Sequence, residues 1–418
     1  MIDLWGTKRL DSSGVGRARP PRGTTTGGGR TRAAVAVVAL AVMAGCSSSS
    51  ATPTTAAATT TTVATTSTVA TTSTVAPPAS SSTSTTSAPT TVAPKTGRGL
   101  AGTVSNFAGS GKADGSGVPG PAATASIGPN LQFAVAPNGD LYVTTGGLQV
   151  LKISGGQVTV FAQLDPPGGP GGGVAVAPDG SVLVATSNTV VKFTTGGQGT
   201  VVLRASTAGL STSLGPIAVD AAGNFYVADG SRRITRVAVN GTTSAFAGTG
   251  TQAPPDSAVG DGGPATASPL GAPTQLVVDS GGNLLIADAS AHRVRRVAPD
   301  GTITTIAGGG TTTLGASEQY APNGTLATDI HLAGVTGLAV DGKGRVYVAD
   351  GQSHAIFRFT VGGGIELVIA DQQGATETAG SAASQTRATN VGPLAIDAQG
   401  NLLYVQTAAL RQIAGAGG

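Results

Sequence analysis

Few side chains in this sequence can act as acids, bases, nucleophiles or strong metal ligands. The 418 residues contain three His, three Glu and one Cys, so most of the 21 acidic residues are Asp. Metal-dependent hydrolases and lyases need several imidazoles or carboxylates gathered at one point. Glu318, Glu366 and Glu377 are scattered among connecting segments. The sequence therefore predicts no catalytic residue, no metal site and no cofactor.

One polar arrangement occurs three times. An Asp ends an apolar segment, and a basic residue follows about four positions later. The three copies are Asp229 with Arg232 and Arg233, Asp288 with His292 and Arg293, and Asp350 with His354. With Asp261 and His331, these residues form a candidate binding face. The alternative is structural, because an Asp at such a position can accept hydrogen bonds from the backbone of its own turn. Recurrence favours that alternative, since a catalytic residue is not expected in triplicate.

A second recurring set consists of Asp and Arg residues at fixed places in the same repeat. It predicts three structural ion pairs, each modest in strength if exposed. The pairs are Asp220 with Arg236, Asp279 with Arg296, and Asp341 with Arg358. Two further copies carry Lys152 and Lys192 at the Arg position and have Ala136 and Ala177 at the Asp position.

These polar residues are positioned by a repeat of short strands and Gly turns. Its first turns centre on six glycines spaced 41 to 62 residues apart, namely Gly139, Gly180, Gly223, Gly282, Gly344 and Gly400. Each copy alternates apolar and polar residues as β-strands do, and Gly, Asn and Asp supply the positive φ that tight hairpins need. Each unit is predicted to be a four-stranded antiparallel meander. Such units must stack to bury their faces, and a radial stack is a β-propeller.

The ends of the repeat region predict how the propeller closes. The last copy stops after three strands, near Ile413. An unpaired segment at 102–109 matches the fourth strands at 241–248 and 301–308. One N-terminal strand and three C-terminal strands would complete a blade. We therefore predict an all-β, six-bladed propeller over residues 96–418, closed by three strands plus one.

The repeat resembles a known family. The stretch Ala218–Asp229, AVDAAGNFYVAD, and its equivalents, followed by His or Arg and alternating apolar residues, are similar to the NHL repeat. The segment Gly260–Leu270, GDGGPATASPL, resembles the loop before many bacterial copies. The resemblance implies a six-bladed propeller. Such propellers are binding platforms, sensors and, in some cases, enzymes, so the fold does not decide the function.

The N-terminal region has a different character. Arginines precede the apolar run Ala33–Ala44, which is too short to span a bilayer. Gly45 and Cys46 follow it, and the pattern resembles a bacterial lipoprotein signal that places a lipid on Cys46. We expect a signal peptide over 1–45. A Ser/Thr/Ala/Pro-rich stretch over 46–95 has too little apolar surface to fold, so we expect a disordered stalk.

The charge of the predicted propeller bears on the kind of partner that it can bind. Residues 96–418 carry 16 Lys and Arg against 19 Asp and Glu, so nucleic acid is not expected as a partner.

Long connections at about 109–130, 248–273, 308–335 and 371–391 should gather on one face. They form either a binding surface or simple linkers. We expect a monomeric binding module for an envelope protein, peptide or glycan, held on the extracytoplasmic membrane surface. The alternative is a metal-dependent hydrolase or lyase, lactonase-like or amidoglycolate-lyase-like, with its site in the channel.

Overall fold

The computed structural model describes residues 103–112, 116–128, 131–146, 148–164, 172–256, 258–313, 323–370 and 389–416. The chain divides into two compact units, Met1–Thr86 and Ser87–Gly418, and every described residue belongs to the second. The predicted signal peptide over 1–45, Cys46 and the stalk over 46–95 lie outside the described residues. None of the described helices has the length and apolar character needed to cross a membrane.

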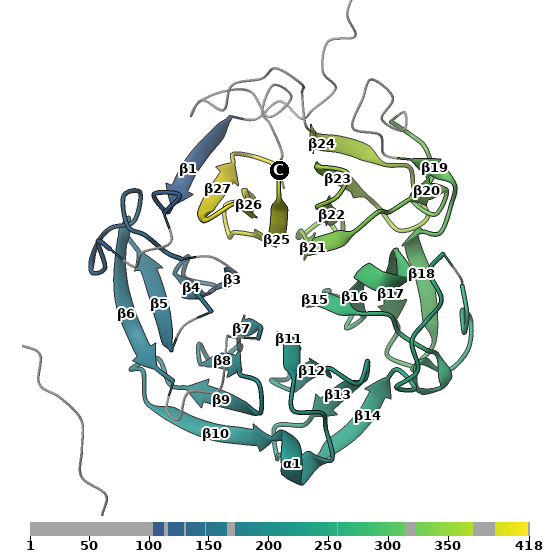
Figure 1. Ribbon diagram of the computed structural model, residues 1–418, viewed down its shortest axis with the longest axis horizontal. Helices are drawn as coiled ribbons and strands as arrows, with labels where there is room; N and C mark the ends of the chain where they lie inside the picture. The colour runs from purple at the N-terminus through teal and green to yellow at the C-terminus, as the bar shows by residue number, and fades with distance from the viewer. Residues whose placement is uncertain are drawn as a thin grey trace, which may run out of the picture. The chain divides into compact units, whose positions relative to one another are not determined.

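Six sheets of four or five described strands surround a central axis, and we call these sheets blades 1 to 6 (Figure 1). Blade 1 contains β3 (Gln132–Val135), β4 (Leu141–Thr144), β5 (Gln149–Ser154) and β6 (Gln157–Gln163), with β2 (Gly120–Pro121) on its outer edge. Blade 2 contains β7 (Val174–Val176), β8 (Val182–Ala185), β9 (Thr189–Phe193) and β10 (Gly199–Arg204). Blade 3 contains β11 (Leu214–Val219), β12 (Phe225–Asp229), β13 (Ile234–Val237) and β14 (Thr243–Ala247).

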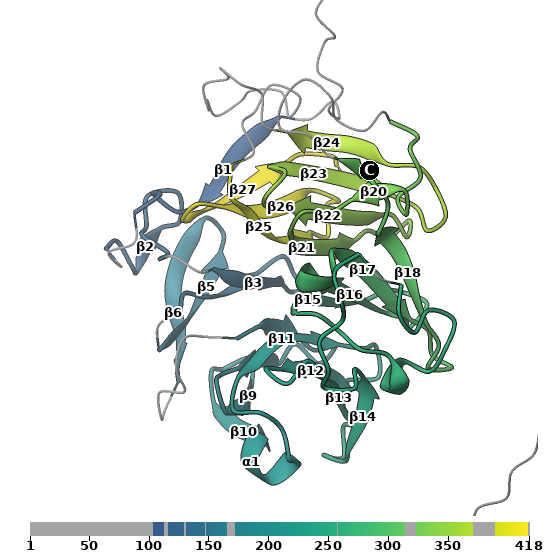
Figure 2. The same cartoon turned by 45° about the vertical axis from the view of Figure 1, so that its right-hand side comes forward.

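The other three blades continue around the axis in chain order. Blade 4 contains β15 (Pro273–Val278), β16 (Leu284–Asp288), β17 (Arg293–Val297) and β18 (Ile303–Gly308). Blade 5 contains β21 (Val335–Val340), β22 (Val346–Asp350), β23 (Ala355–Phe359) and β24 (Glu366–Ala370), side by side in that order (Figure 2). Blade 6 contains β25 (Val391–Ile396), β26 (Leu402–Gln406), β27 (Ala409–Ile413) and β1 (Val104–Ala108).

Small elements lie in the connections between strands. They are α1 (Ala205–Ala208), the 3-10 turns η1 (Ala265–Ala267) and η2 (Ala289–Ala291), and the parallel pair β19 (Thr312–Thr313) and β20 (Ile330–His331).

Closure of the ring follows the prediction of three strands plus one. Strand β1 pairs antiparallel with β27, with Val104 opposite Ile413, and completes blade 6. This pairing satisfies the edge of β27, which would otherwise offer unpaired backbone groups. The six-bladed all-β fold is confirmed. One detail differs from the prediction, because β2 adds a fifth strand to blade 1 through Gly120 opposite Val158.

The core lies between neighbouring blades. Second strands are buried along their whole length in all six blades, because both of their faces meet another blade. One cluster joins Leu285 and Val294 of blade 4 to Val335, Val348 and Phe357 of blade 5. Each blade therefore gains its stability from its neighbours, as stacked repeats do.

Polar side chains also link the innermost strands across the axis. Gln275 of β15 donates from Nε2 to the Leu394 carbonyl at 2.8 Å, and its Oε1 accepts from the Leu338 amide at 2.8 Å. One side chain thus joins blades 4, 5 and 6. Thr274 and Thr336 add hydrogen bonds to the carbonyls of Val335 and Val391 in the next blades.

We expect Gln275→Ala to lower the free energy of unfolding by about 1–3 kcal/mol, because backbone groups in the channel lose their partners. Urea denaturation of the full chain measures the loss. Gln157→Ala, at the exposed start of β6, is the control and should stay within about 0.5 kcal/mol of the parent. Equal losses in the two variants would contradict the proposed cross-link.

Candidate functional site

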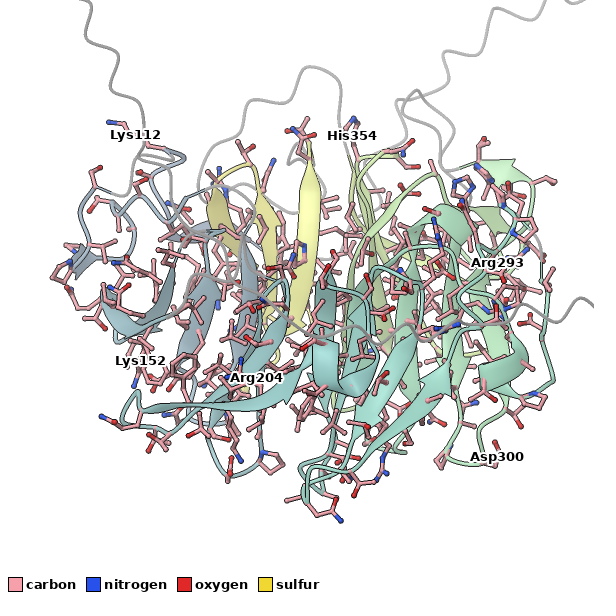
Figure 3. All side chains as sticks on the ribbon, turned by 60° about the horizontal axis from the view of Figure 1, so that its bottom comes forward. Lys112, Lys152, Arg204, Arg293, Asp300 and His354 are labelled. Carbon is pink, nitrogen blue, oxygen red and sulfur yellow. The ribbon has the colours of Figure 1, made fainter. Side chains whose placement is uncertain are left out.

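The strand register shows that two kinds of loop lie on the same edge of the propeller. In blade 4, Pro273 at the start of β15 lies opposite Asp288 at the end of β16, and Arg293 at the start of β17 lies opposite Gly308 at the end of β18. Loops between second and third strands therefore share this edge with the connections between blades. We call it the top edge. Figure 3 shows His354 at the top, with Asp300 of the β17–β18 turn on the opposite edge.

The three recurring Asp residues each hold a top-edge loop in place. Asp229 accepts hydrogen bonds from the amides of its own turn and from the Ser211 amide at 3.0 Å. Asp288 accepts from the Gly271 and Ala272 amides at 2.9 and 2.8 Å. Burial raises the pKa of the Asp288 carboxyl, and these amides oppose that effect. These contacts fit the structural role that Asp can play in a turn.

Asp350 makes the most extensive set of these contacts. Its side chain is fully buried and accepts from the amides of four residues, which are Ala333, Gly334, Gln352 and Ser353, and from the Ser353 hydroxyl. Two of these donors belong to the incoming connection and two to the β22–β23 loop. The carboxylate therefore fastens the two neighbouring segments of the top edge together.

The basic residue after each Asp occupies a turn of unusual backbone geometry. Arg232, His292 and His354 have φ values of 61°, 56° and 51°. This left-handed conformation is uncommon for residues other than Gly, Asn and Asp, although His adopts it more often than most. The turns thus present equivalent side chains in blades 3, 4 and 5. Arg232 donates to the Gln252 side chain at 3.1 Å, and Arg233 donates to the Thr249 carbonyl at 3.0 Å.

Two predicted members of the binding face make structural contacts, although Asp261 itself remains exposed. Asp261 forms an ion pair with Arg295 at 2.6 Å and also accepts from the Thr305 amide at 3.1 Å. The Arg295 side chain is fully buried. Arg293 is also buried, and burial lowers the pKa of its guanidinium. These residues hold the segment around Asp261 against blade 4.

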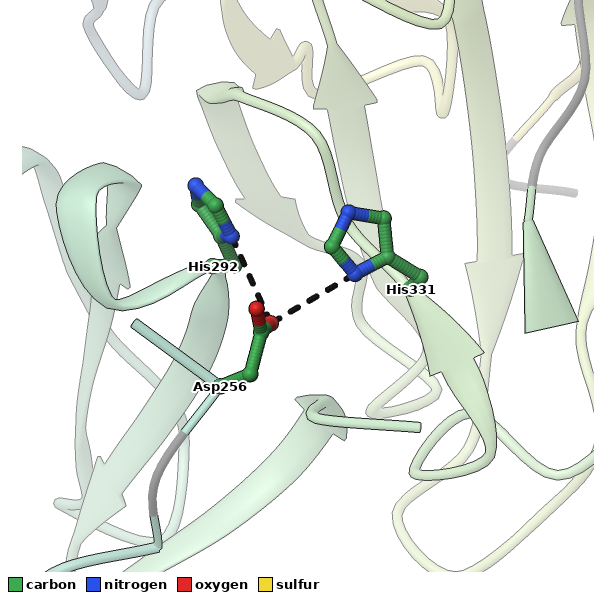
Figure 4. Close-up of side chains that lie close together, drawn as sticks. All are labelled: Asp256, His292 and His331. Atoms are coloured by element: carbon green, nitrogen blue, oxygen red, sulfur yellow. Dashed lines mark ion pairs between the residues drawn. The ribbon is translucent and has the colours of Figure 1, made fainter. Parts of the chain in front are cut away.

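The structure brings His292 and His331 together around Asp256, which is not among the predicted site residues. A carboxylate oxygen of Asp256 lies 3.3 Å from His292 Nδ1 and 3.4 Å from His331 Nδ1 (Figure 4). The two imidazole rings meet edge to face with centroids 5.4 Å apart. Three groups able to bind a metal ion therefore converge at one point of the top edge. His354, the equivalent of His292 in blade 5, is not part of this cluster.

Each member of the cluster comes from a different segment. Asp256 lies in the connection between blades 3 and 4, and its amide donates to the Ala291 carbonyl at 3.4 Å. His292 follows η2 and immediately precedes β17. His331 lies on β20, where the buried side chains of Ile330 and Leu332 anchor the connection between blades 4 and 5. The cluster is therefore over the outer strands of blade 4, away from the central channel.

The prediction of direct Asp–Arg ion pairs in blades 3 to 5 is corrected by the structure. In blade 5, both side chains pair with other residues. Asp341 pairs with Arg345 at 2.6 Å, and Arg358 pairs with Glu366 at 2.8 Å. The Tyr347 hydroxyl stands between Asp341 and Arg358 and bonds to both.

The other two predicted pairs, Asp220 with Arg236 and Asp279 with Arg296, are likewise not formed. Asp220 accepts from Asn224 and from the Tyr226 hydroxyl, and Asp279 accepts from Asn283. The carboxylates are occupied by their own turns, two to six residues along the chain.

The two Lys-bearing blades do form such pairs. Lys152 lies 2.8 Å from Asp140, and Lys192 lies 2.9 Å from Asp179. Hydrogen bonds from Ser181 and Lys192 lower the pKa of the Asp179 carboxyl to about 2. In these two blades the Asp partner lies in the Gly turn and not at the end of the first strand. Asp140 follows Gly139, and Asp179 precedes Gly180.

Comparison with known proteins supports the repeat type. A family described as the Teneurin NHL domain matches residues 170–316, which span blades 2 to 4. The match and the six-bladed fold support an NHL-type propeller. A comparison with curated protein sequences finds no match.

Solved structures share the architecture at low sequence identity. A Bacteroides thetaiotaomicron protein of unknown function is 19% identical, with a TM-score of 0.56 over 75% of this chain and 76% of that chain. An auxiliary nutrient binding protein from Bacteroides ovatus is 14% identical, with a TM-score of 0.56 and the same two coverages. Virginiamycin B lyase from Staphylococcus aureus overlaps less well, at 11% identity and a TM-score of 0.44 over 69% of this chain and 81% of that chain. These likenesses concern the fold.

Proposed function

We propose that this protein is a lipid-anchored binding module that engages a ligand or protein partner through its top edge. The observation that carries the proposal is that the described parts of three top-edge connections are tied to the blades by Asp229, Asp288 and Asp350. Loops fixed on a rigid scaffold are where binding residues concentrate. Auxiliary nutrient binding proteins among the structures of similar fold are compatible with this role.

The expected setting is the extracytoplasmic surface of a membrane. Cys46 would carry the lipid, and residues 46–95 would hold the propeller away from the bilayer. Without the first 45 residues the chain carries 17 Lys and Arg against 19 Asp and Glu. An envelope protein, a peptide or a glycan therefore suits it better than nucleic acid does.

The alternative, a hydrolase or lyase with a metal in the channel, has less support. None of the six innermost strands, all of which the structure describes, contains Asp, Glu or His. Gln275 uses its amide to join three blades in the channel. Ligands for a channel metal would have to come from other elements.

Site-specific photo-cross-linking in cells tests the binding proposal. A photoreactive amino acid replaces exposed Gln352 on the top edge or, as the matched control, exposed Asp300 on the opposite edge. We expect adducts from position 352 and none from position 300. Adducts from position 300 alone, or from neither position, would overturn the proposed surface.

The same cells test the proposed anchor. The Cys46→Ser chain should move from the membrane fraction to the soluble fraction, because its lipid attachment site is lost. Retention of that variant on the membrane would contradict the anchor but not the binding surface.

A further inference from the structure

We propose that Asp256, His292 and His331 form a binding site for a divalent transition-metal ion of the zinc class. The site lies over the outer strands of blade 4 and is separate from the channel. It would give the top edge a metal-dependent binding point, independent of which partner the propeller recognises.

The spacing of the ligand atoms fits such an ion. Zinc binds imidazole nitrogen and carboxylate oxygen at about 2.0–2.2 Å, so two ligands at tetrahedral angles stand about 3.3–3.6 Å apart. The Asp256 oxygen lies at 3.3 and 3.4 Å from the two Nδ1 atoms. Two edges of the coordination polyhedron are thus already in place. One ligand atom from each of the three residues lies within 4.8 Å of the other two, so a single ion can reach all three groups.

The environment of the His292 Nδ1 atom supports a role as a metal ligand. Its Nδ1 is buried and has no hydrogen-bond partner, although the Asp256 oxygen is 3.3 Å away. A buried polar atom without a partner costs free energy. A metal ion between the imidazole and the carboxylate would satisfy both groups.

Backbone contacts hold the three groups in place before any ion binds. The His292 amide donates to the Ala289 carbonyl at 3.1 Å, and the Asp256 amide reaches the Ala291 carbonyl of the same turn. Strand β20 fixes His331 by pairing with β19, and the Gly310 amide donates to the Ile330 carbonyl at 3.0 Å. Ligands that are already positioned lose little conformational entropy on binding.

The surrounding charges are compatible with a cation. Arg293 and Arg295 lie near the cluster, and three carboxylates, those of Asp256, Asp261 and Asp288, act on Arg293. Among these five groups the carboxylates outnumber the guanidinium groups by one. Asp261 holds Arg295 at 2.6 Å, which neutralises the fully buried cation.

The ligand types select the class of ion. Two imidazoles and one carboxylate suit Zn²⁺ and its transition-metal neighbours, whereas Ca²⁺ and Mg²⁺ prefer oxygen ligands. Three protein ligands leave at least one coordination position for water or for a donor atom of a bound molecule.

Zn²⁺ titration of the full chain by calorimetry tests the site, in a Cys46→Ser background so that the only thiol cannot bind metal. We expect one Zn²⁺ per chain. Asp256→Asn and His331→Ala should each weaken binding by at least about 10-fold, since each removes a direct ligand.

Two other ions test the metal class. Co²⁺ should give the visible absorption of a tetrahedral complex, and excess Ca²⁺ should not displace Zn²⁺.

His354→Ala is the matched control, since His354 has the same left-handed turn position in blade 5 and lies outside the cluster. It should bind Zn²⁺ as the parent does. Both substituted ligands are partly exposed, and circular dichroism verifies that the variants fold. Absent Zn²⁺ binding, unchanged affinity in both ligand variants, or equal loss in His354→Ala would each overturn the proposal.

Discussion

Replacing Asp350 with Ala should lower the free energy of unfolding by about 3–5 kcal/mol, a large part of the stability of a typical domain. The substitution removes the acceptor of four backbone amides and one hydroxyl at a fully buried position. Water cannot easily replace those hydrogen bonds, so each amide keeps its desolvation penalty. Equilibrium urea denaturation of the full chain gives the measurement.

A conservative variant at position 350 and a control variant at an exposed Asp test this expectation. Asp350→Asn keeps one acceptor oxygen but turns an NH₂ group toward the amides, so its loss should fall between those of the parent and Asp350→Ala. Asp300→Ala, in the exposed β17–β18 turn, should leave the free energy of unfolding close to that of the parent. A loss in Asp350→Ala no greater than that in Asp300→Ala would show that the carboxylate does not hold the loops.

Replacing Val104 with Asp should open the closure of the ring. Val104 is 2% exposed, lies opposite Ile413 and packs in the cluster between blades 5 and 6. An acidic group there is buried without a partner, so we expect a loss of about 3–5 kcal/mol in the free energy of unfolding. Thermal unfolding should shift to lower temperature, and limited proteolysis should cut within β1 first.

Ser105→Asp is the matched control on the same strand. Its side chain is exposed, because neighbouring residues of a strand point to opposite faces. The expected change is within about 0.5 kcal/mol. If Val104→Asp were as stable as Ser105→Asp, pairing of β1 with β27 would contribute little to the closed ring.

Local sequence carries enough information for most of this fold. Each blade forms from consecutive segments whose alternating apolar residues and Gly turns define short antiparallel strands. The turns at Gly139 and Gly282 need positive φ, and the structure gives them φ values of 86° and 74°. Even the long-range closure could be predicted, because the segment at 102–109 repeats the pattern of a fourth strand that the last copy lacks.

The partners of individual side chains were harder to predict. Asp341 and Arg358 occupy the expected places in blade 5, yet the Tyr347 hydroxyl lies between them and Arg345 takes the carboxylate. Such a choice depends on side-chain reach and competition over a few ångströms. A repeat pattern fixes the strand position of a residue but not the outcome of that competition.

The sequence by itself determined the number of blades, their strand order and the edge on which the long connections meet. Tertiary structure alone decided that Asp256 lies beside His292 and His331, and that Gln275 joins three blades. The physical reason is the range of the interactions. Strand alternation and turns depend on neighbours along the chain, whereas the cluster depends on two irregular connections whose paths are set by packing on the finished blades.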